Sequence, residues 1–279
     1  MANPHPPVEQ RRRPRPTPLT RRADLDPGLA GDLAAALAAR QIVPYYQPVI
    51  DLASGEVVGA EALSRWELGD GSLRTPDAFL DLVQATGRLR AMGRSVMEQA
   101  CTAFAQAAPT AQGWWVAVNL SADDCVARGL PTQIEDCLER TGLEPCRLVV
   151  EISEQLVPGP TVNRALEAIR DLGVRVALDD YGSRYSSLDQ LCSLPLDIVK
   201  LDRSMLRARS AEEAKVLFDT VALADSLGLG VVVEGIETPE QHLLAAVAGA
   251  GLAQGFLWGA AVRYDEFVAT WPRTSDAAS

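Results

Sequence analysis

The chain has 279 residues, of which 47% are hydrophobic and 23% charged, and its formal net charge is -11 at pH 7. A chain of this size and composition can bury a large core, either as one large domain or as two small ones. No apolar run approaches the roughly 18 residues of a membrane span, and the N-terminus carries charge and proline where a signal peptide is apolar. We therefore expect a cytoplasmic protein without a transmembrane segment.

The N-terminal segment differs in composition from the rest of the chain. It is rich in proline, and its first 22 residues hold six arginines against one acid, Glu9. We expect residues 1–27 to be a disordered tail, residues 28–271 to form one domain, and residues 272–279 to be a flexible tail. The basic tail is either a tether to anionic membrane or nucleic acid, or a solvated extension. The remaining chain is more acidic than the total, which argues against binding of duplex nucleic acid.

Eight short apolar or β-branched runs follow one another, from VPYYQPVIDL (43–52) to GLAQGFLWG (251–259). Most are separated by segments of helical periodicity, among them 75–87, 161–173, 210–228 and 238–250. This alternation predicts an α/β fold in which a parallel sheet closes into a (β/α)8 TIM-like barrel. Only a short connection around 53–55 separates the first two runs, so we expect an antiparallel first strand.

A barrel of this kind collects its functional groups at the C-terminal ends of its strands. Polar residues occupy this position in seven consecutive predicted strands: Glu61, Asn119, Glu151, Asp179 with Asp180, Lys200, Glu234 and Gln254. Any one of them alone is more simply explained as a helix cap or a solvated side chain. Several carboxylates at one mouth would repel one another unless a cation offset their charge, so the set predicts a metal site.

The expected ligands are all oxygen atoms, which select Mg²⁺, Mn²⁺ or Ca²⁺ over zinc or copper. His5 lies in the tail and His242 on a predicted helix, so neither is expected at the mouth. The adjacent carboxylates of Asp179 and Asp180 could hold two ions, an arrangement that recurs in phosphodiester hydrolysis. Side chains alternate along a strand, so both can reach the mouth only if the backbone turns sharply there.

Lys200 allows three interpretations. It could stabilise charge and orient an attacking water, it could form the Schiff base of an aldolase, or it could pair with Asp202 in a structural salt bridge. The acidic surroundings favour the first, because they would keep the amine protonated and hence a poor nucleophile. The residue alone does not exclude the other two.

Seven motifs occur in order along the chain: EALSRW (61–66), VNLS (118–121), EISE (151–154), DDYGSRYSS (179–187), VKLDRS (199–204), EGIET (234–238) and QGF (254–256). Together they resemble the EAL-domain family of cyclic-di-GMP phosphodiesterases, over about residues 28 to 271. The resemblance implies a barrel with an antiparallel first strand. It also implies metal-dependent hydrolysis of one phosphodiester bond of cyclic-di-GMP to linear pGpG, with one or two Mg²⁺ or Mn²⁺ ions, and a homodimer.

The resemblance also implies roles for individual residues. The metal ligands would be Glu61, Asn119, Glu151, Asp179 and Asp180. Glu234 would be the general base, Lys200 would hold the catalytic water, and Asp180 would serve a second ion. The substrate would contact Gln47, Arg65 and Gln254. Glu154 would support the loop after the fifth strand, and Glu237 would lie beside the site.

The main departure from the family pattern lies in the loop after the paired aspartates. Arg184 stands where the family usually has glycine. If the backbone at this position needs a positive φ, the arginine costs roughly 1 kcal/mol or more relative to glycine. The departure bears on the loop and on dimerisation more than on the catalytic groups. Because every metal and base position is filled, we favour an active enzyme. The alternative is an inactive EAL domain that acts as a cyclic-di-GMP receptor or a protein-interaction module.

Overall fold

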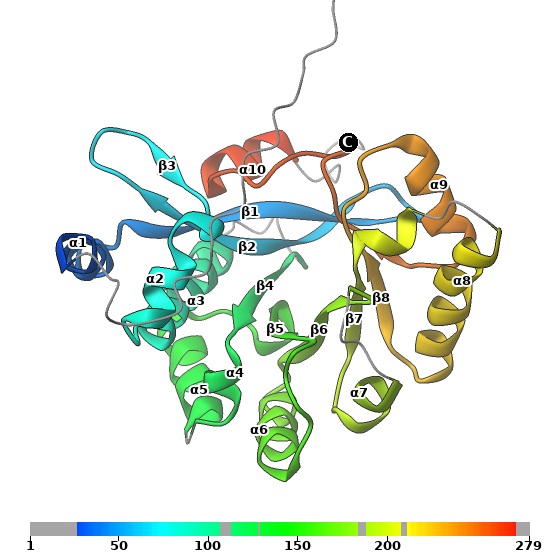
Figure 1. The fold of residues 1–279 in the computed structure, drawn as a ribbon, viewed down its shortest axis with the longest axis horizontal. Helices are drawn as coiled ribbons and strands as arrows, with labels where there is room; N and C mark the ends of the chain where they lie inside the picture. Colours follow the sequence, from blue (N-terminus) through cyan, green and yellow to red (C-terminus); the bar gives the residue numbers. More distant parts are fainter. Residues whose placement is uncertain (1–26, 107–112, 128, 184–187, 208–210, 272–279) are drawn as a thin grey trace, which may run out of the picture.

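The computed structural model describes residues 27–106, 113–127, 129–183, 188–207 and 211–271. The described part of the chain contains nine strands: β1 (Ile42–Asp51), β2 (Val57–Glu67), β3 (Leu73–Arg74), β4 (Trp115–Leu120), β5 (Leu148–Ser153), β6 (Arg175–Tyr181), β7 (Ile198–Leu201), β8 (Gly230–Val233) and β9 (Leu252–Ala253). They are hydrogen-bonded in the order β1-β9-β8-β7-β6-β5-β4-β2-β3, and β1 also pairs with β2. That last pairing closes eight of the strands into a barrel, as predicted, and β3 extends β2 outside it (Figure 1).

Strand β1 runs antiparallel to both of its neighbours, β2 and β9, whereas the pairs from β2–β4 to β8–β9 are parallel. The connection between β1 and β2 is a tight turn in which Asp51 Oδ1 accepts hydrogen bonds from the backbone N–H groups of Ala53 and Ser54. Gly55 completes this turn with φ of +74°, a conformation that glycine adopts without strain. The antiparallel first strand that the short connection predicted is therefore confirmed.

Helices surround the barrel, and α10 packs against β1 (Figure 1). Their bounds are α1 (Pro27–Ala38), α2 (Leu80–Ala85), α3 (Leu89–Gln106), α4 (Ala122–Cys125), α5 (Leu130–Thr141), α6 (Pro160–Asp171), α7 (Leu188–Ser193), α8 (Ala211–Ser226), α9 (Pro239–Val247) and α10 (Tyr264–Thr270), with 3-10 turns η2 (Pro76–Ala78), η4 (Pro145–Arg147) and η5 (Arg203–Leu206). The helix predicted over 75–87 is interrupted: it forms η2 and the short α2. Among the described residues, no helix is long and apolar enough to span a membrane.

The interior of the barrel is closed by an apolar plug, the cluster of Val49, Trp115, Ala117, Val149, Ala177, Ile198 and Val232. Trp115 is its largest member, and Gly59 faces it from the neighbouring strand. A Cβ at Gly59 would lie 2.3 Å from Trp115 Cδ2, so the indole fits only because that position has no side chain. Since side chains alternate along a strand, the residues two positions beyond the plug also point inward, one layer higher.

Candidate active site

The layer directly above the plug is polar. Plug residues Ala117, Val149, Ala177, Ile198 and Val232 are each followed, two positions on, by a member of this layer. Those members are Asn119, Glu151, Asp179, Lys200 and Glu234. The strand register supports the common level, because Asn119 is paired with Glu151. The two-residue period of the strands thus carries these side chains to one mouth of the barrel.

Lys200 lies at the centre of this layer and is only 2% exposed. Its Nζ is 2.7 Å from Asp179 Oδ1, 2.7 Å from Glu234 Oε1, 2.9 Å from Glu151 Oε1 and 3.2 Å from Glu61 Oε2. Asp202 is not among these partners in the described part of the chain, and its carboxylate instead accepts a hydrogen bond from the backbone N–H of Ser204. The interpretation of Lys200 as a salt-bridge partner of Asp202 is therefore wrong. The ammonium group of Lys200 instead faces four carboxylates.

Amide side chains fix the carboxylate of Glu61 from two sides. Asn119 Nδ2 donates to Glu61 Oε1 over 3.0 Å, and Gln254 Nε2 donates to Glu61 Oε2 over 2.8 Å. Gln254 also donates to Gln47 Oε1 over 3.0 Å, and Gln47 Nε2 donates to the backbone oxygen of Gly259. The three amides therefore hold Glu61 in one orientation and leave the Oδ1 of Asn119 outside this network.

Asp179 and Asp180 both reach the mouth because the backbone of β6 turns sharply at Asp180. Asp180 has φ of +58°, which is unusual for a residue other than glycine, and the β6–β7 register is interrupted between Leu178 and Tyr181. Carboxylate oxygens of Asp179, Asp180 and Glu234 consequently lie within 4.8 Å of one another. The sharp turn that two neighbouring aspartates required is present, and it is centred on Asp180 itself.

The charges of the mouth shift the pKa values of its acids in different directions. Burial, together with the charges of Glu61 and Asp179, raises the pKa of Glu151 well above its ordinary value. Burial and the charge of Asp179, opposed by Lys200, raise the pKa of Glu234 to about 8. For Glu61, Lys200 and the hydrogen bonds from Gln254 and Asn119 outweigh burial, so its pKa is lowered.

The pKa values of Lys200 and Asp180 are consistent with this excess of acids. The four carboxylates outweigh the effect of burial on Lys200 and hold its pKa well above the ordinary value, so the amine stays protonated. A protonated amine cannot form a Schiff base, which removes the basis of the aldolase interpretation. Partial shielding from water and the charge of Asp179 raise the pKa of Asp180 to about 6.

The residues of the mouth fit a hard divalent cation. Asp179, Asp180 and Glu234 offer oxygen atoms close enough to share an ion, and the buried Glu151 Oε2 accepts no hydrogen bond from any residue that the structure describes. A cluster of oxygen donors with more negative charge than one lysine can offset is what magnesium or manganese prefers. This set overlaps the predicted ligands only in part, because it includes Glu234 and the oxygens of Glu61 are already occupied by hydrogen bonds.

Two hollows flank the mouth, and the side chains of Glu61 and Leu63 line both. One, of about 250 Å³, is bordered by Asp180, Glu234 and residues that follow β7, β8 and β9. The other, of about 370 Å³, is mainly apolar and extends from Asn119 and Asp179 towards helices α2 and α3. The acidic groups thus lie where two cavities meet, an arrangement suited to an extended ligand with two bulky ends.

Comparison with known proteins gives the relationship directly. Residues 30–261 match the model of the family described as the EAL domain. The chain belongs to this family. It is 34% identical over 247 residues to the bifunctional diguanylate cyclase/cyclic di-GMP phosphodiesterase MucR of Pseudomonas aeruginosa, a match that covers 87% of this chain and 36% of MucR. It is 28% identical to the cyclic di-GMP phosphodiesterase PdeL of Escherichia coli, covering 86% of this chain and 67% of PdeL.

Solved EAL structures share the fold. The MucR phosphodiesterase of Pseudomonas aeruginosa in complex with c-di-GMP superposes with a TM-score of 0.80 at 34% identity, over 86% of this chain and 99% of that one. The EAL enzyme Bd1971 bound to cAMP and cyclic-di-GMP gives a TM-score of 0.81 at 24% identity, over 87% of this chain and 68% of that one, which supports the fold alone. The chain spans only about a third of the length of the full MucR protein.

The Glu-Ala-Leu sequence of this EAL domain lies in the middle of β2, not at the strand end that the sequence predicts for Glu61. The reason is that β2 pairs with β4 only from Gly59 to Ala62, and beyond that point continues alongside β1 and β3. Glu61 therefore still lies near the barrel mouth, although the strand extends to Glu67.

Other predicted residues lie at different distances from the mouth. Arg65 lines neither hollow: Nη1 donates to the backbone oxygen of Ser64, and the guanidinium lies over the ring of Tyr45. Glu154 is buried and accepts a hydrogen bond from Ser183 Oγ in the loop after β6. Glu237 borders the smaller hollow. Arg184 lies outside the described residues.

Two further side chains of the smaller hollow were not predicted from the sequence. Arg203 borders this hollow at the start of η5, and Phe256 borders it while remaining 67% exposed. Both belong to motifs of the family pattern, Arg203 to VKLDRS and Phe256 to QGF. Phe256 is recognisable as a functional residue because it is a large exposed aromatic side chain beside a polar cavity. That exposure is seen only in the structure and cannot be read from the sequence.

Proposed function

We propose that this EAL domain hydrolyses one phosphodiester bond of cyclic-di-GMP to give linear pGpG, with the help of Mg²⁺ or Mn²⁺. The observation that carries the proposal is the position of Lys200 and its four carboxylates between two hollows. The named cyclic di-GMP phosphodiesterases among its relatives support it. A bound divalent cation would acidify water and neutralise charge on the phosphodiester oxygens.

The metal would be held by oxygen atoms of Asp179, Asp180 and Glu151, with Glu61 and Asn119 completing the site after their mutual hydrogen bond rearranges. The anionic phosphodiester could not approach so many carboxylates without such a cation, because like charges at these distances repel strongly. The acidity of the mouth therefore supports a cation-dependent reaction rather than binding of the dinucleotide alone.

Glu234 is our proposed proton acceptor for the attacking water. Its carboxylate borders the smaller hollow, and its pKa is raised to about 8 without a cation. The positive charge of a bound cation would lower that pKa, so that the carboxylate could accept a proton near neutral pH. Lys200 would orient Glu234 and Asp179, since its ammonium lies 2.7 Å from each, and would offset charge as the reaction proceeds.

The two hollows would accept the two guanosine halves of the substrate. In the smaller one, the exposed ring of Phe256 can stack on a base and Arg203 can pair with a phosphate. In the larger one, Leu80 and Met92 offer an apolar surface to the other base. Gln47 and Gln254 would contact the substrate near the scissile bond, whereas Arg65 would have to leave Tyr45 to do so.

Incubation of the protein with cyclic-di-GMP and either metal, followed by chromatography, tests the proposal. We expect pGpG from the wild type and from the control Glu240→Gln, which changes an exposed acid of α9. We expect none from Glu61→Ala and strongly reduced turnover from Glu234→Gln. Calorimetric binding in Ca²⁺ separates the outcomes: binding without turnover in Mg²⁺ and Mn²⁺ would reject the enzyme and leave a receptor.

We also propose that the protein forms a homodimer through the face around α7. Val157 and Leu188 are 77% and 60% exposed. Leu188 is the first residue of α7, and Val157 lies beside this helix, since Gln190 Nε2 donates a hydrogen bond to the backbone oxygen of the neighbouring Leu156. Burial of exposed apolar side chains is a common driving force for association. Sedimentation velocity should show a dimer that Leu188→Glu converts to a monomer; a monomeric wild type would reject this interface.

A further inference from the structure

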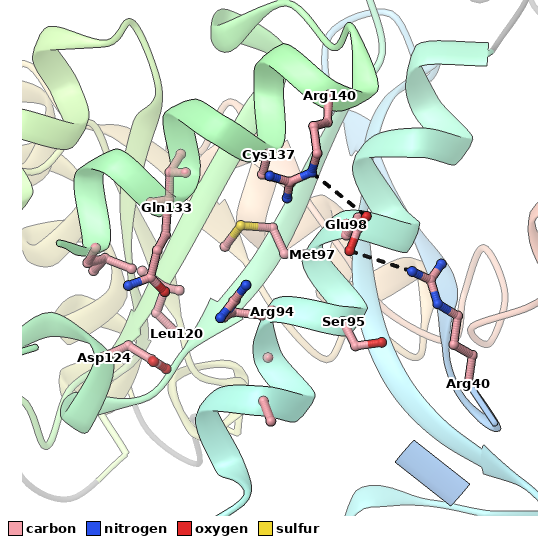
Figure 2. Close-up of a pocket in the computed structure, with 14 residues that line it drawn as sticks. Arg40, Arg94, Ser95, Met97, Glu98, Leu120, Asp124, Gln133, Cys137 and Arg140 are labelled. Atoms are coloured by element: carbon pink, nitrogen blue, oxygen red, sulfur yellow. Dashed lines mark ion pairs between the residues drawn. The ribbon is translucent and has the colours of Figure 1, made fainter. Parts of the chain in front are cut away.

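A pocket of about 250 Å³ lies between helices α3 and α5 (Figure 2). None of the four carboxylates around Lys200 lines it. It shares Gly93, Leu120 and Asp124 with the larger hollow of the active site, so the two cavities have a common wall. The proposed phosphodiester hydrolysis makes no use of this pocket.

The inner surface of the pocket is apolar. Met97, Leu120 and Ile134 line it and are 6%, 8% and 0% exposed, and the buried Cys137 adds a thiol. These residues come from three elements, α3, β4 and α5, which the core packing holds in place. The pocket is therefore a preformed cavity that can accept a compact apolar group without a large rearrangement.

The rim of the pocket carries three arginines. Arg40 and Arg140 lie on either side of Glu98, whose carboxylate is 3.7 Å and 4.0 Å from them, and all three groups are substantially exposed (Figure 2). Ion pairs this long and this exposed contribute little energy, so both guanidinium groups remain available to another anion. Arg94 lines the pocket, and its guanidinium group makes no ion pair or hydrogen bond within the described residues.

The acids of the pocket do not neutralise this rim. Asp124 is already engaged, because its carboxylate accepts hydrogen bonds from Ser121 and lies 3.3 Å from Arg90 Nε. That leaves one shared acid, Glu98, for three arginines. This local excess of arginines is opposite in sign to the net charge of the chain, which is -11.

We infer that this pocket is a second ligand site, which binds a small organic anion with an apolar body. The carboxylate, sulfonate or phosphate group of the ligand would pair with Arg94 and Arg140, and the apolar body would lie against Met97, Leu120 and Ile134. Guanidinium groups suit this role because they pair with planar and tetrahedral oxyanions through two hydrogen bonds at once. The inference is independent of whether the acidic mouth hydrolyses cyclic-di-GMP.

The inference is tested with two fluorescent probes of nearly the same shape, 1-anilinonaphthalene-8-sulfonate, an anion, and N-phenyl-1-naphthylamine, which is neutral. In the full chain we expect saturable binding of the anion that weakens at least fivefold in Arg94→Gln and in Arg140→Gln, and further in the double variant. The control Arg164→Gln, which changes an exposed arginine of α6, should bind as the wild type does.

The neutral probe separates charge recognition from general apolar binding, which could also occur in the larger hollow beside Leu80. Its affinity should be the same in all five proteins, the wild type, the three pocket variants and the control. The inference is overturned if the anionic probe does not bind, if its affinity is unchanged in the double variant, or if both probes weaken equally. Circular dichroism and unfolding midpoints equal to those of the wild type confirm that the variants are folded.

Discussion

Replacing Lys200 by methionine tests what holds the acidic mouth together in the metal-free protein. The variant keeps an unbranched, apolar chain of similar length but removes the one ammonium group that lies 2.7 to 3.2 Å from four carboxylates. Removing one partner of a buried ion pair typically costs about 3–5 kcal/mol of folding free energy, because the remaining charge is left buried and unpaired. We expect a loss of this size at pH 8 in EDTA.

The loss should be smaller at pH 5.5. Without Lys200, the folded protein must take up at least one more proton on the mouth acids, whose pKa values are already raised at Glu151 and Glu234. Each additional proton costs about 1.4 kcal/mol for every pH unit above the ordinary carboxyl pKa, so the interval of about 2.5 pH units corresponds to about 3.5 kcal/mol. The loss at pH 5.5 should therefore be smaller than at pH 8 by about this amount.

Urea unfolding followed by circular dichroism at both pH values provides the measurement. The matched control is Lys215→Met, because Lys215 pairs with Asp219 on the exposed surface of α8 and such pairs contribute about 0.5 kcal/mol or less. A loss for the Lys200 variant below about 1 kcal/mol at pH 8, or an equal loss at both pH values, would refute the charge balance described here.

Three further predictions concern the same site. In EDTA the wild type should become less stable as pH rises from about 4.5 to 8, because the folded state keeps protons on Glu151 and on Glu234 that the unfolded chain releases. Urea unfolding midpoints that do not fall over this range would contradict the prediction, and saturating Mg²⁺ should reduce the decline. Asp180→Gly should be about 1 kcal/mol more stable than Asp180→Ala, since φ is +58° and both variants remove the same charge; equal urea midpoints would count against strain at this residue. Gly255→Ala should weaken cyclic-di-GMP binding measured by calorimetry, because the added Cβ would lie 2.0 Å from the backbone oxygen of Ile236 and displace Gln254. The control Gly251→Ala should bind as the wild type does, because a Cβ at Gly251 meets open space. Equal affinities of the two variants would show that the backbone adapts.

Much of the site could be predicted from the sequence because β-strands repeat every two residues. Once Val149, Ala177 and Ile198 are recognised as inward-facing, Glu151, Asp179 and Lys200 must lie one layer above them. The short connection between the first two strands likewise fixed their antiparallel pairing. In both cases a local rule determined a tertiary arrangement.

Features that depend on how far an element extends were not predictable. The end of β2 is set by pairing with β3, a two-residue strand with no pattern of its own, so Glu61 looked like the last residue of its strand. The contact of Arg65 with Tyr45 depends on neighbours in β1, and that of Arg203 with the smaller hollow depends on where η5 begins. Such contacts follow from packing between strands and loops, which single-sequence patterns do not encode.

The proposed function requires that water attacks a phosphodiester bond of cyclic-di-GMP at the acidic mouth. Its most direct test is a single turnover in H₂¹⁸O, with protein and Mn²⁺ in excess over cyclic-di-GMP and mass spectrometry of the products. We predict pGpG that carries one ¹⁸O atom in its terminal phosphate. Recovery of bound but unchanged cyclic-di-GMP, or of a linear product without the label, would contradict the account.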